Sequence, residues 1–351
     1  MEASKKKTIY MAMFLGGSIL LSSLAVYFYQ IFFSANVLRR AEKPVVLIIP
    51  TGATFQQVRD TLMRGAYINH EMSFMVVAKA LGYPEKIKPG RYIIKPKMSN
   101  IALVRKLRSG DQSPVRVTFN NVRLKKDLAG KIVRNLEIVG DSAKLLQKLS
   151  DPALAQKYGF DTTTLMCMFI PNTYELFWTT KEDELLDRMH KEYVKFWNDE
   201  RKAKAEKIGL TPVQVSILAS IVEAETKKKD EAPRVAGVYM NRLTREDRKL
   251  RADPTVVYAL GDFGIKRVLF EHLKYDSPYN TYLYAGLPPG PINLPSIAAI
   301  DAVLNHEKHE YMFFCAKEDF SGYHVFAVDY NEHLQNADRY RKALDRLKIM
   351  R

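Results

Sequence analysis

The chain has 351 residues, enough for one large domain or two to three small ones, and its 47% hydrophobic and 26% charged residues are typical of a globular protein. The formal net charge of +15 favours an anionic partner or surface, such as nucleic acid, anionic lipid or an acidic polymer, although a solvated basic surface without a specific partner explains it equally well. The two cysteines and seven histidines show no metal-ligand spacing, so the sequence indicates neither a metal site nor a cofactor.

The N-terminal segment predicts a membrane anchor. Thr8 to Leu38 carries no charge and is longer than the roughly 20 residues that cross a bilayer. The lysines at 5–7 favour a cytoplasmic N-terminus, whereas the arginines at 39–40 weaken that orientation. A cleaved signal peptide has a shorter apolar core. We therefore expect a cytoplasmic tail (1–7), a retained transmembrane helix (8–34) and an outer portion, which argues against nucleic acid as a partner.

The first outer region, 44–112, alternates strand and helix patterns. VVLIIP indicates a strand, TGATFQQVRDTLMRGAYI and SFMVVAKAL indicate two helices, KPGRYIIKP a turn and strand, and SNIALVRKLRSG a capped helix that ends at a glycine. This order is typical of small modules that bind sugar polymers. PTGATFQQVRDTL also resembles a LysM-like module.

The rest of the chain divides into an intermediate α+β region, 113–206, and a last domain, 207–351. In the first, VRVTFNN indicates a strand, MCMFIPNTYELFW a loop or strand, and 181–206 a charged amphipathic helix. In the second, Thr211 and Pro212 begin a helix that we expect to run to about Lys228, and Asp253 caps a helix with Pro254 at its first position. YMFFCAKEDFSGYHVFAV indicates a hairpin. The predicted fold class is α+β.

A carboxylate closes the apolar helix that contains SILASIVEAET. Glu223 continues a face of small residues (Ser216, Ala219, Ser220), against which a large substrate could lie, while Glu225 lies roughly 200° around the axis. Desolvation at this position is expected to raise the pKa of Glu223, as a general acid requires. The alternative is a structural glutamate that pairs with Arg234 or Lys227, or caps the next loop.

The segment YDSPYNTYLYAGLPPGPI combines five tyrosines, Asn280 and a rigid turn. Aromatic rings suit the apolar faces of sugars, and an amide both donates to and accepts from hydroxyl and acetamido groups. The alternative is a hydrophobic loop that only packs on its domain.

ASIVEAET, VAGVYMNRL, LRADPTVVYALG, SPYNTYLYAGLPPGPI and GYHVFAVDYNEH follow one another in an order that resembles the endolytic murein transglycosylase (YceG-like) family. The resemblance covers nearly the whole chain and implies an inner-membrane enzyme with a periplasmic catalytic domain. Such enzymes cleave the β-1,4 bond between N-acetylmuramic acid and N-acetylglucosamine within nascent glycan strands and leave 1,6-anhydro ends. The resemblance also implies termination of glycan elongation and association with peptidoglycan synthases.

The resemblance implies that Glu223 is the catalytic glutamate and Glu225 a supporting, substrate-binding residue. A glycoside hydrolase usually needs two carboxylates. A lytic transglycosylase uses the 6-hydroxyl of its own substrate as nucleophile, so one glutamate can serve as acid and then as base. We assign the other residues of the matching motifs to the glycan cleft as a group, although Asp253 equally begins a helix: Asn241, Arg242, Asp253, Thr255, Tyr279, Asn280, Thr281, Tyr282, Gly286, Leu287, Pro288, Pro289 and Gly290.

The sequence departs from the family pattern in two places. GPINLPS replaces a Pro-Gly that many relatives have, and Ser296 is instead placed to cap the following helix. In the middle region, MCMFIPNTYE has Met166, Cys167 and Asn172 where relatives often have Glu, Gly and Asp.

Cys167 and Cys315 lie in apolar surroundings, which favours buried thiols over a disulfide. A non-catalytic peptidoglycan-binding scaffold of a synthesis complex remains the alternative function.

Overall fold

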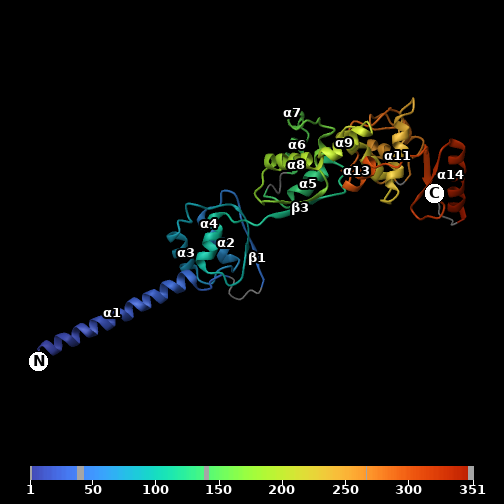
Figure 1. The fold of residues 1–351 in the computed structure, drawn as a ribbon. Coiled ribbons are helices and arrows are strands. Elements are labelled where there is room, and N and C mark those ends of the chain that lie inside the picture. Colours follow the sequence, from blue (N-terminus) through green and yellow to red (C-terminus); the bar gives the residue numbers. More distant parts are fainter. Residues whose placement is uncertain (1, 38–42, 138–141, 266, 347–351) are drawn as a thin grey trace. The chain divides into compact units, whose positions relative to one another are not determined.

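The computed structural model describes residues 2–37, 43–137, 142–265 and 267–346. They form two compact units. The first contains the chain up to 116 together with 135–137 and 175–180, and the second contains 117–134, 138–174 and 181–351. Both strands and helices occur throughout, so the predicted α+β class is confirmed (Figure 1).

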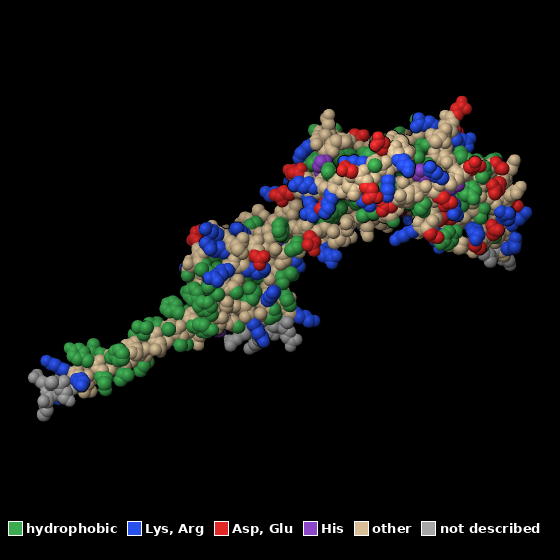
Figure 2. All heavy atoms as spheres, in the orientation of Figure 1, with side chains coloured by type: hydrophobic (Ala, Val, Ile, Leu, Met, Phe, Trp, Pro, Cys, Tyr) green, Lys and Arg blue, Asp and Glu red, His purple; other side chains and the backbone are tan. Residues whose placement is uncertain are grey.

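The first unit begins with a long apolar helix, α1 (Glu2–Phe33), which is long and apolar enough to span a membrane. Figure 2 shows hydrophobic side chains along this helix and lysines near its start. The arginines at 39–40, which bear on its orientation, lie outside the described residues. The end of α1 packs on the module that follows, where Ile31 is buried and its carbonyl accepts a hydrogen bond from the Asn100 side chain (2.8 Å).

The module after α1 has the predicted order of elements. It consists of β1 (Val45–Ile49), α2 (Phe55–Arg64), α3 (Glu71–Ala80), β2 (Gly90–Ile94) and α4 (Asn100–Ser109). The two strands pair antiparallel. Ser99 caps α4, and Gly110 ends it in the left-handed region that glycine adopts without steric cost. The relation of this module to LysM modules stays a prediction.

The second unit begins within β3 (Val115–Phe119), which pairs with β4 (Asn172–Leu176). The helices between them are α5 (Lys125–Val133), α6 (Ser142–Leu149), α7 (Pro152–Lys157) and the short 3₁₀ turn η1 (Leu165–Met168). The single helix predicted over 181–206 is wrong. Asn198 breaks it by capping a new helix through its side chain, giving α8 (Glu182–Phe196) and α9 (Asp199–Lys207).

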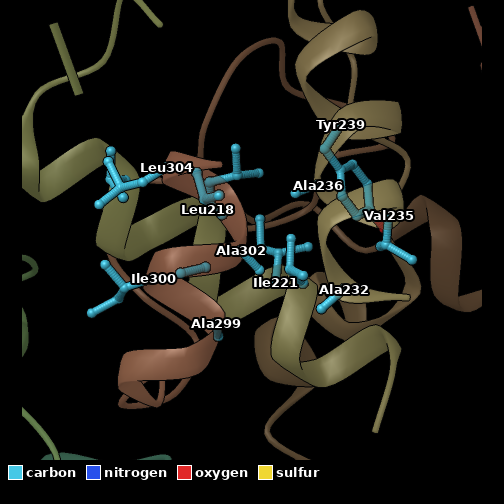
Figure 3. Close-up of a cluster of buried hydrophobic side chains, with 14 of the residues drawn as sticks. Leu218, Ile221, Ala232, Val235, Ala236, Tyr239, Ala299, Ile300, Ala302 and Leu304 are labelled. Atoms are coloured by element: carbon cyan, nitrogen blue, oxygen red, sulfur yellow. The ribbon is translucent and has the colours of Figure 1, made fainter. Parts of the chain in front are cut away.

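The last part of the chain forms the core around the candidate site. It contains α10 (Pro212–Glu225), α11 (Ala232–Leu243), α12 (Asp253–Leu260), η2 (His272–Lys274), α13 (Ile297–Leu304), β5 (Phe313–Ala316), β6 (His324–Ala327) and α14 (Tyr330–Arg346). The hairpin β5–β6 forms as predicted. Figure 3 shows Leu218 and Ile221 of α10 between residues of α11 and α13 in a buried cluster.

Candidate active site

Helix α10 presents its carboxylates at its C-terminal end. Thr211 and Gln214 form a reciprocal capping box, and Pro212 occupies the first turn, so the predicted start of the helix is confirmed. The helix ends at Glu225 rather than near Lys228, because Thr226 takes an extended conformation and its side chain bonds to Glu231. The two glutamates therefore lie in the final turn, next to the connection to α11.

The small-residue face of α10 is covered by the protein itself, so the expectation that a substrate lies along it is wrong. Ser216, Ala219 and Ser220 are buried. The Ser220 hydroxyl accepts a hydrogen bond from the amide of Ile292 (3.0 Å), and the Ser220 carbonyl accepts one from the Asn293 side chain (2.8 Å). The small side chains admit the segment before α13 and leave only the end of the helix open.

Glu223 is half-buried at that open end. Its Oε2 accepts a hydrogen bond from the amide of Ser296 (2.7 Å), and Ser296 caps α13 as the sequence predicted. Lys227 contacts only the backbone carbonyl of Glu223 (3.3 Å), and Arg234 pairs with Glu307 instead (2.9 Å). Within the described residues the Glu223 carboxylate has no ion pair and its Oε1 has no hydrogen-bond partner, so one oxygen is oriented and the other is left for a ligand.

A groove of about 950 Å³ passes the end of α10. Glu223, Glu225 and Asp253 all line it, so the structure brings these three predicted site residues to one groove. Aromatic, apolar and basic side chains complete its walls; these are Asn121, Arg123, Lys227, Pro254, Val257, Tyr258, Phe263, Ile265, Arg267, Val268, Ile292, Asn293, Leu294, His324 and Tyr340, together with Ala224 and Ala316. This mixture of rings, acids and amides suits a neutral polymer with many hydroxyl groups.

The pKa of Glu225 is raised to about 7. Burial is the main cause and the negative charge of Asp253 adds to it, whereas the hydrogen bond from Tyr239 and the positive charges of His324 and Arg242 oppose the rise. The Tyr239 hydroxyl donates to Glu225 Oε1 at 2.5 Å. Glu225 is thus poised to change charge near neutral pH, as groups at functional sites often are.

A second cavity of about 450 Å³ shares Glu225, Asp253, Ala316 and His324 with the groove. Asp253 is the first residue of α12 and not its cap, because Ala252 precedes the helix in an extended conformation. The Asp253 carboxylate instead accepts a hydrogen bond from the Tyr282 hydroxyl (2.6 Å). Asp253 and Tyr282 therefore both face the cavity, along with Arg242.

Several other residues assigned to the cleft are held by internal hydrogen bonds. Asn280 and Thr281 are fully buried and bond to the loop that carries them and to Ala252 and Thr255. Asn241 donates to the carbonyls of His309 and Tyr311, and the buried Arg242 to those of Met312 and Leu250. These side chains shape the loops around the cavities, and their contact with substrate stays a prediction.

The GLPPG segment is fixed by its contacts with the loop before η1. Thr163 donates its hydroxyl to the carbonyl of Pro289 (2.9 Å), and a Cβ on Gly290 would collide with the Thr163 carbonyl. Gly286 has a positive φ of 82° and donates to the carbonyl of Arg248. Tyr279 packs against Tyr258 with ring centroids 4.8 Å apart, so it supports a ring that lines the groove.

The chain is similar over most of its length to proteins of one family. A model of the YceG-like family matches residues 47–339. The chain belongs to the YceG-like family. An endolytic murein transglycosylase of Bacillus subtilis (strain 168) is 28% identical over 310 residues, 83% of this chain and 83% of that protein.

Two further similarities extend the comparison. An endolytic murein transglycosylase of Streptococcus pneumoniae serotype 2 is 26% identical over 324 residues, 84% of this chain and 58% of that longer protein. A crystal structure of a YceG-like protein from Listeria monocytogenes has a TM-score of 0.56 at 25% identity, covering 84% of this chain and 99% of that one. The YceG-like fold thus extends over most of the chain.

Two site residues of this YceG-like chain escaped the sequence reasoning. His324 lines both cavities, and Glu231 is buried beneath it. The sequence signal that could have indicated His324 was its place in the motif GYHVFAV, because a lone histidine in a strand does not by itself indicate a site.

Among the described residues no three His, Cys, Asp or Glu side chains form a group able to hold a metal ion. Cys167 and Cys315 are free thiols.

Proposed function

We propose that the chain is a membrane-anchored lytic transglycosylase that cleaves peptidoglycan glycan strands internally, with Glu223 as the acid and then the base. The proposal is supported by membership of the YceG-like family and by relatives that are named endolytic murein transglycosylases. The observation that carries it is the Glu223 carboxylate, which lies on a groove with one oxygen held by Ser296 and the other open.

The proposed reaction needs one proton donor and no water. Glu223 protonates the glycosidic oxygen as the bond from that oxygen to C1 of N-acetylmuramic acid breaks. The 6-hydroxyl oxygen of the same sugar then bonds to C1 and gives its proton back to Glu223. The glutamate ends as it began, the leaving strand gains a 4-hydroxyl, and the other strand ends in a 1,6-anhydro sugar.

The N-terminal unit is proposed to hold this activity at the membrane. We place α1 across the inner membrane with the lysines at 5–7 in the cytoplasm and the groove in the periplasm. The LysM-like module would then bind glycan as it leaves a synthase. Internal cleavage of the glycan strand as it leaves the synthase would end elongation of that strand.

The first test is product analysis by mass spectrometry with the full-length protein in detergent and uncrosslinked glycan strands. Glu223→Gln keeps an acceptor for the Ser296 amide but cannot release a proton, so we expect a loss of at least about 100-fold in cleavage rate. Glu206→Gln, on exposed α9, is the matched control and should retain full activity.

Each outcome separates the candidate functions. Anhydro ends formed by the wild type and the control, but not by Glu223→Gln, support the proposal. Reducing ends from the wild type would instead identify a hydrolase that uses water and a second carboxylate. Strands that are bound but not cleaved would identify a scaffold.

A further inference from the structure

The connection between α10 and α11 holds a buried carboxylate against the imidazole of His324. Glu231 is 4% exposed, and both its oxygens are engaged. Oε1 accepts from the backbone amide of His324 (2.7 Å), while Oε2 lies 2.8 Å from His324 Nδ1 and accepts from the Thr226 hydroxyl at 3.0 Å. Two chain segments that are far apart in sequence thus meet at one hydrogen-bonded pair of side chains.

This arrangement fixes the orientation of the imidazole. A carboxylate only accepts hydrogen bonds, so Nδ1 of His324 must carry the proton that bonds to Glu231. The ring of Phe314 packs edge-on against the imidazole with centroids 5.2 Å apart. Among the described residues Nε2 has no hydrogen-bond partner, and His324 lines both the groove and the second cavity. The ring is therefore locked on one side and open on the other.

His324 and Glu225 line the same two cavities. The charged and titratable groups that act on Glu225 come from four elements besides α10: Tyr239 and Arg242 from α11, Asp253 from α12, Tyr282 from the loop before α13, and His324 from β6. Arg242 already donates to the carbonyls of Leu250 and Met312, and Asp253 opposes ionisation of Glu225. His324 differs from Arg242 in that, among the described residues, the Nε2 edge of its ring is not engaged by a backbone carbonyl.

We propose that His324, oriented by Glu231, is a positioning residue that keeps Glu225 ionised, so that the two glutamates of α10 have different tasks. Glu223 carries the proton, and the Glu225 carboxylate stabilises positive charge on the sugar. This inference rests on the proposed function, because the transition state of glycosidic cleavage resembles an oxocarbenium ion with positive charge near C1. A nearby carboxylate stabilises that charge only while it is ionised.

The sign of the pH effect follows from the charges. If the reaction needs ionised Glu225, activity rises with pH through the pKa of Glu225, which is about 7 in the wild type. His324→Gln removes a positive charge, so the pKa of Glu225 rises. The acidic limb of the pH–rate profile then shifts toward higher pH by about one unit.

The test is the pH–rate profile of full-length protein in detergent, followed as release of anhydro ends. We expect His324→Gln to lose activity on the acidic side of the profile. At its new pH optimum, its activity should lie within a few-fold of the wild-type maximum. His190→Gln, on α8 away from both cavities, is the matched control and should leave the profile unchanged. A uniform loss at every pH would mean that His324 only fastens the hairpin, and would overturn the proposal.

A second measurement does not depend on activity. The pKa of Glu225 is read from ¹³C NMR of the full-length protein with labelled glutamate carboxyls, using Glu225→Gln to assign the signal. An upward shift in His324→Gln supports the inference even if no cleavage is detected, in which case the proposed function fails by itself. An unchanged titration overturns the inference whether or not the enzyme is active.

Discussion

The two units bury polar side chains in different ways. In the first, the Asn36 side chain donates to Asn100 Oδ1 (2.7 Å) and accepts from the amide of His70 (2.8 Å), and Asn100 donates to the end of α1. Both amides are buried and neutral. In the second, the buried or half-buried groups around the cavities include Arg242, Glu231 and Glu225, which carry or can carry charge.

This difference indicates what each network is for. A neutral amide pair with satisfied hydrogen bonds holds its geometry at any pH and produces little field, which suits a fixed junction between a helix and its module. Buried charges are costly to keep, but they respond to a proton or to charge that develops on a substrate. Three substitutions test whether a charged buried network loses more folding free energy than a neutral one when a partner is removed.

The largest effect is expected at Arg242. Arg242→Met keeps most of the volume but removes the donors to Met312 and Leu250 and leaves both carbonyls unpaired. We expect the free energy of unfolding of the second unit to fall by about 3–5 kcal/mol. Hydrogen exchange of α11 and β5 in the full-length protein measures it.

The control for this change is Arg245→Met, whose side chain is partly exposed and 3.8 Å from Asp247. It should change stability by less than about 1 kcal/mol. Equal losses in the two variants would contradict a special role for the buried guanidinium.

An intermediate effect is expected in the first unit. Asn100→Ala removes the shortest of the three acceptors of the Asn36 amide, leaving the His70 carbonyl and the Ser73 hydroxyl, and it deprives the Ile31 carbonyl of this donor. The loss should be about 2–3 kcal/mol, confined to the contacts between α1, α3 and α4. Hydrogen exchange near Val37 reports it, and Gln56→Ala on the exposed face of α2 is the control. A loss as large as that of Arg242→Met would break the comparison between neutral and charged networks.

The smallest effect is expected from a neutral network in the second unit. The Thr281 hydroxyl lies 2.8 Å from that of Thr255 and accepts from the Ala252 amide at 3.0 Å. Thr281→Val should cost about 1 kcal/mol, because it removes one acceptor and preserves the packing. Urea unfolding measures it, with exposed Thr244→Val as control. A much larger cost would show that location in the second unit, and not charge, sets the penalty.

Local sequence signals predicted the elements that they control directly. Thr211 with Pro212 gave the start of α10, Ser99 with Gly110 gave both ends of α4, and the strand pattern around 313–327 gave the hairpin. Each of these features depends on residues within a few positions of one another. The missed break at Asn198 was also local, and its signal was an N-cap residue inside a run of helix-forming residues.

The site was predicted only in part. Periodicity placed Glu223 at the end of an apolar helix, but the neighbours that define its surroundings come from elsewhere: Ser296 lies 73 residues further along the chain. Asp253 of α12 and His324 of β6 likewise come to line one cavity with Glu225 only in the folded chain. Burial raises the pKa of Glu225, and burial is not readable from one helix.

The sequence by itself therefore determined the apolar first helix, the α+β succession, the caps and the motif that ends at Glu223, because these follow from spacing and from contacts between near neighbours. Only the tertiary structure decided that the small face of α10 is covered by the segment before α13, that the Ser296 amide holds one oxygen of Glu223, and that Glu231 holds His324. Those features depend on the distances between segments far apart in the chain and on the solvent that their packing excludes, which no local pattern encodes.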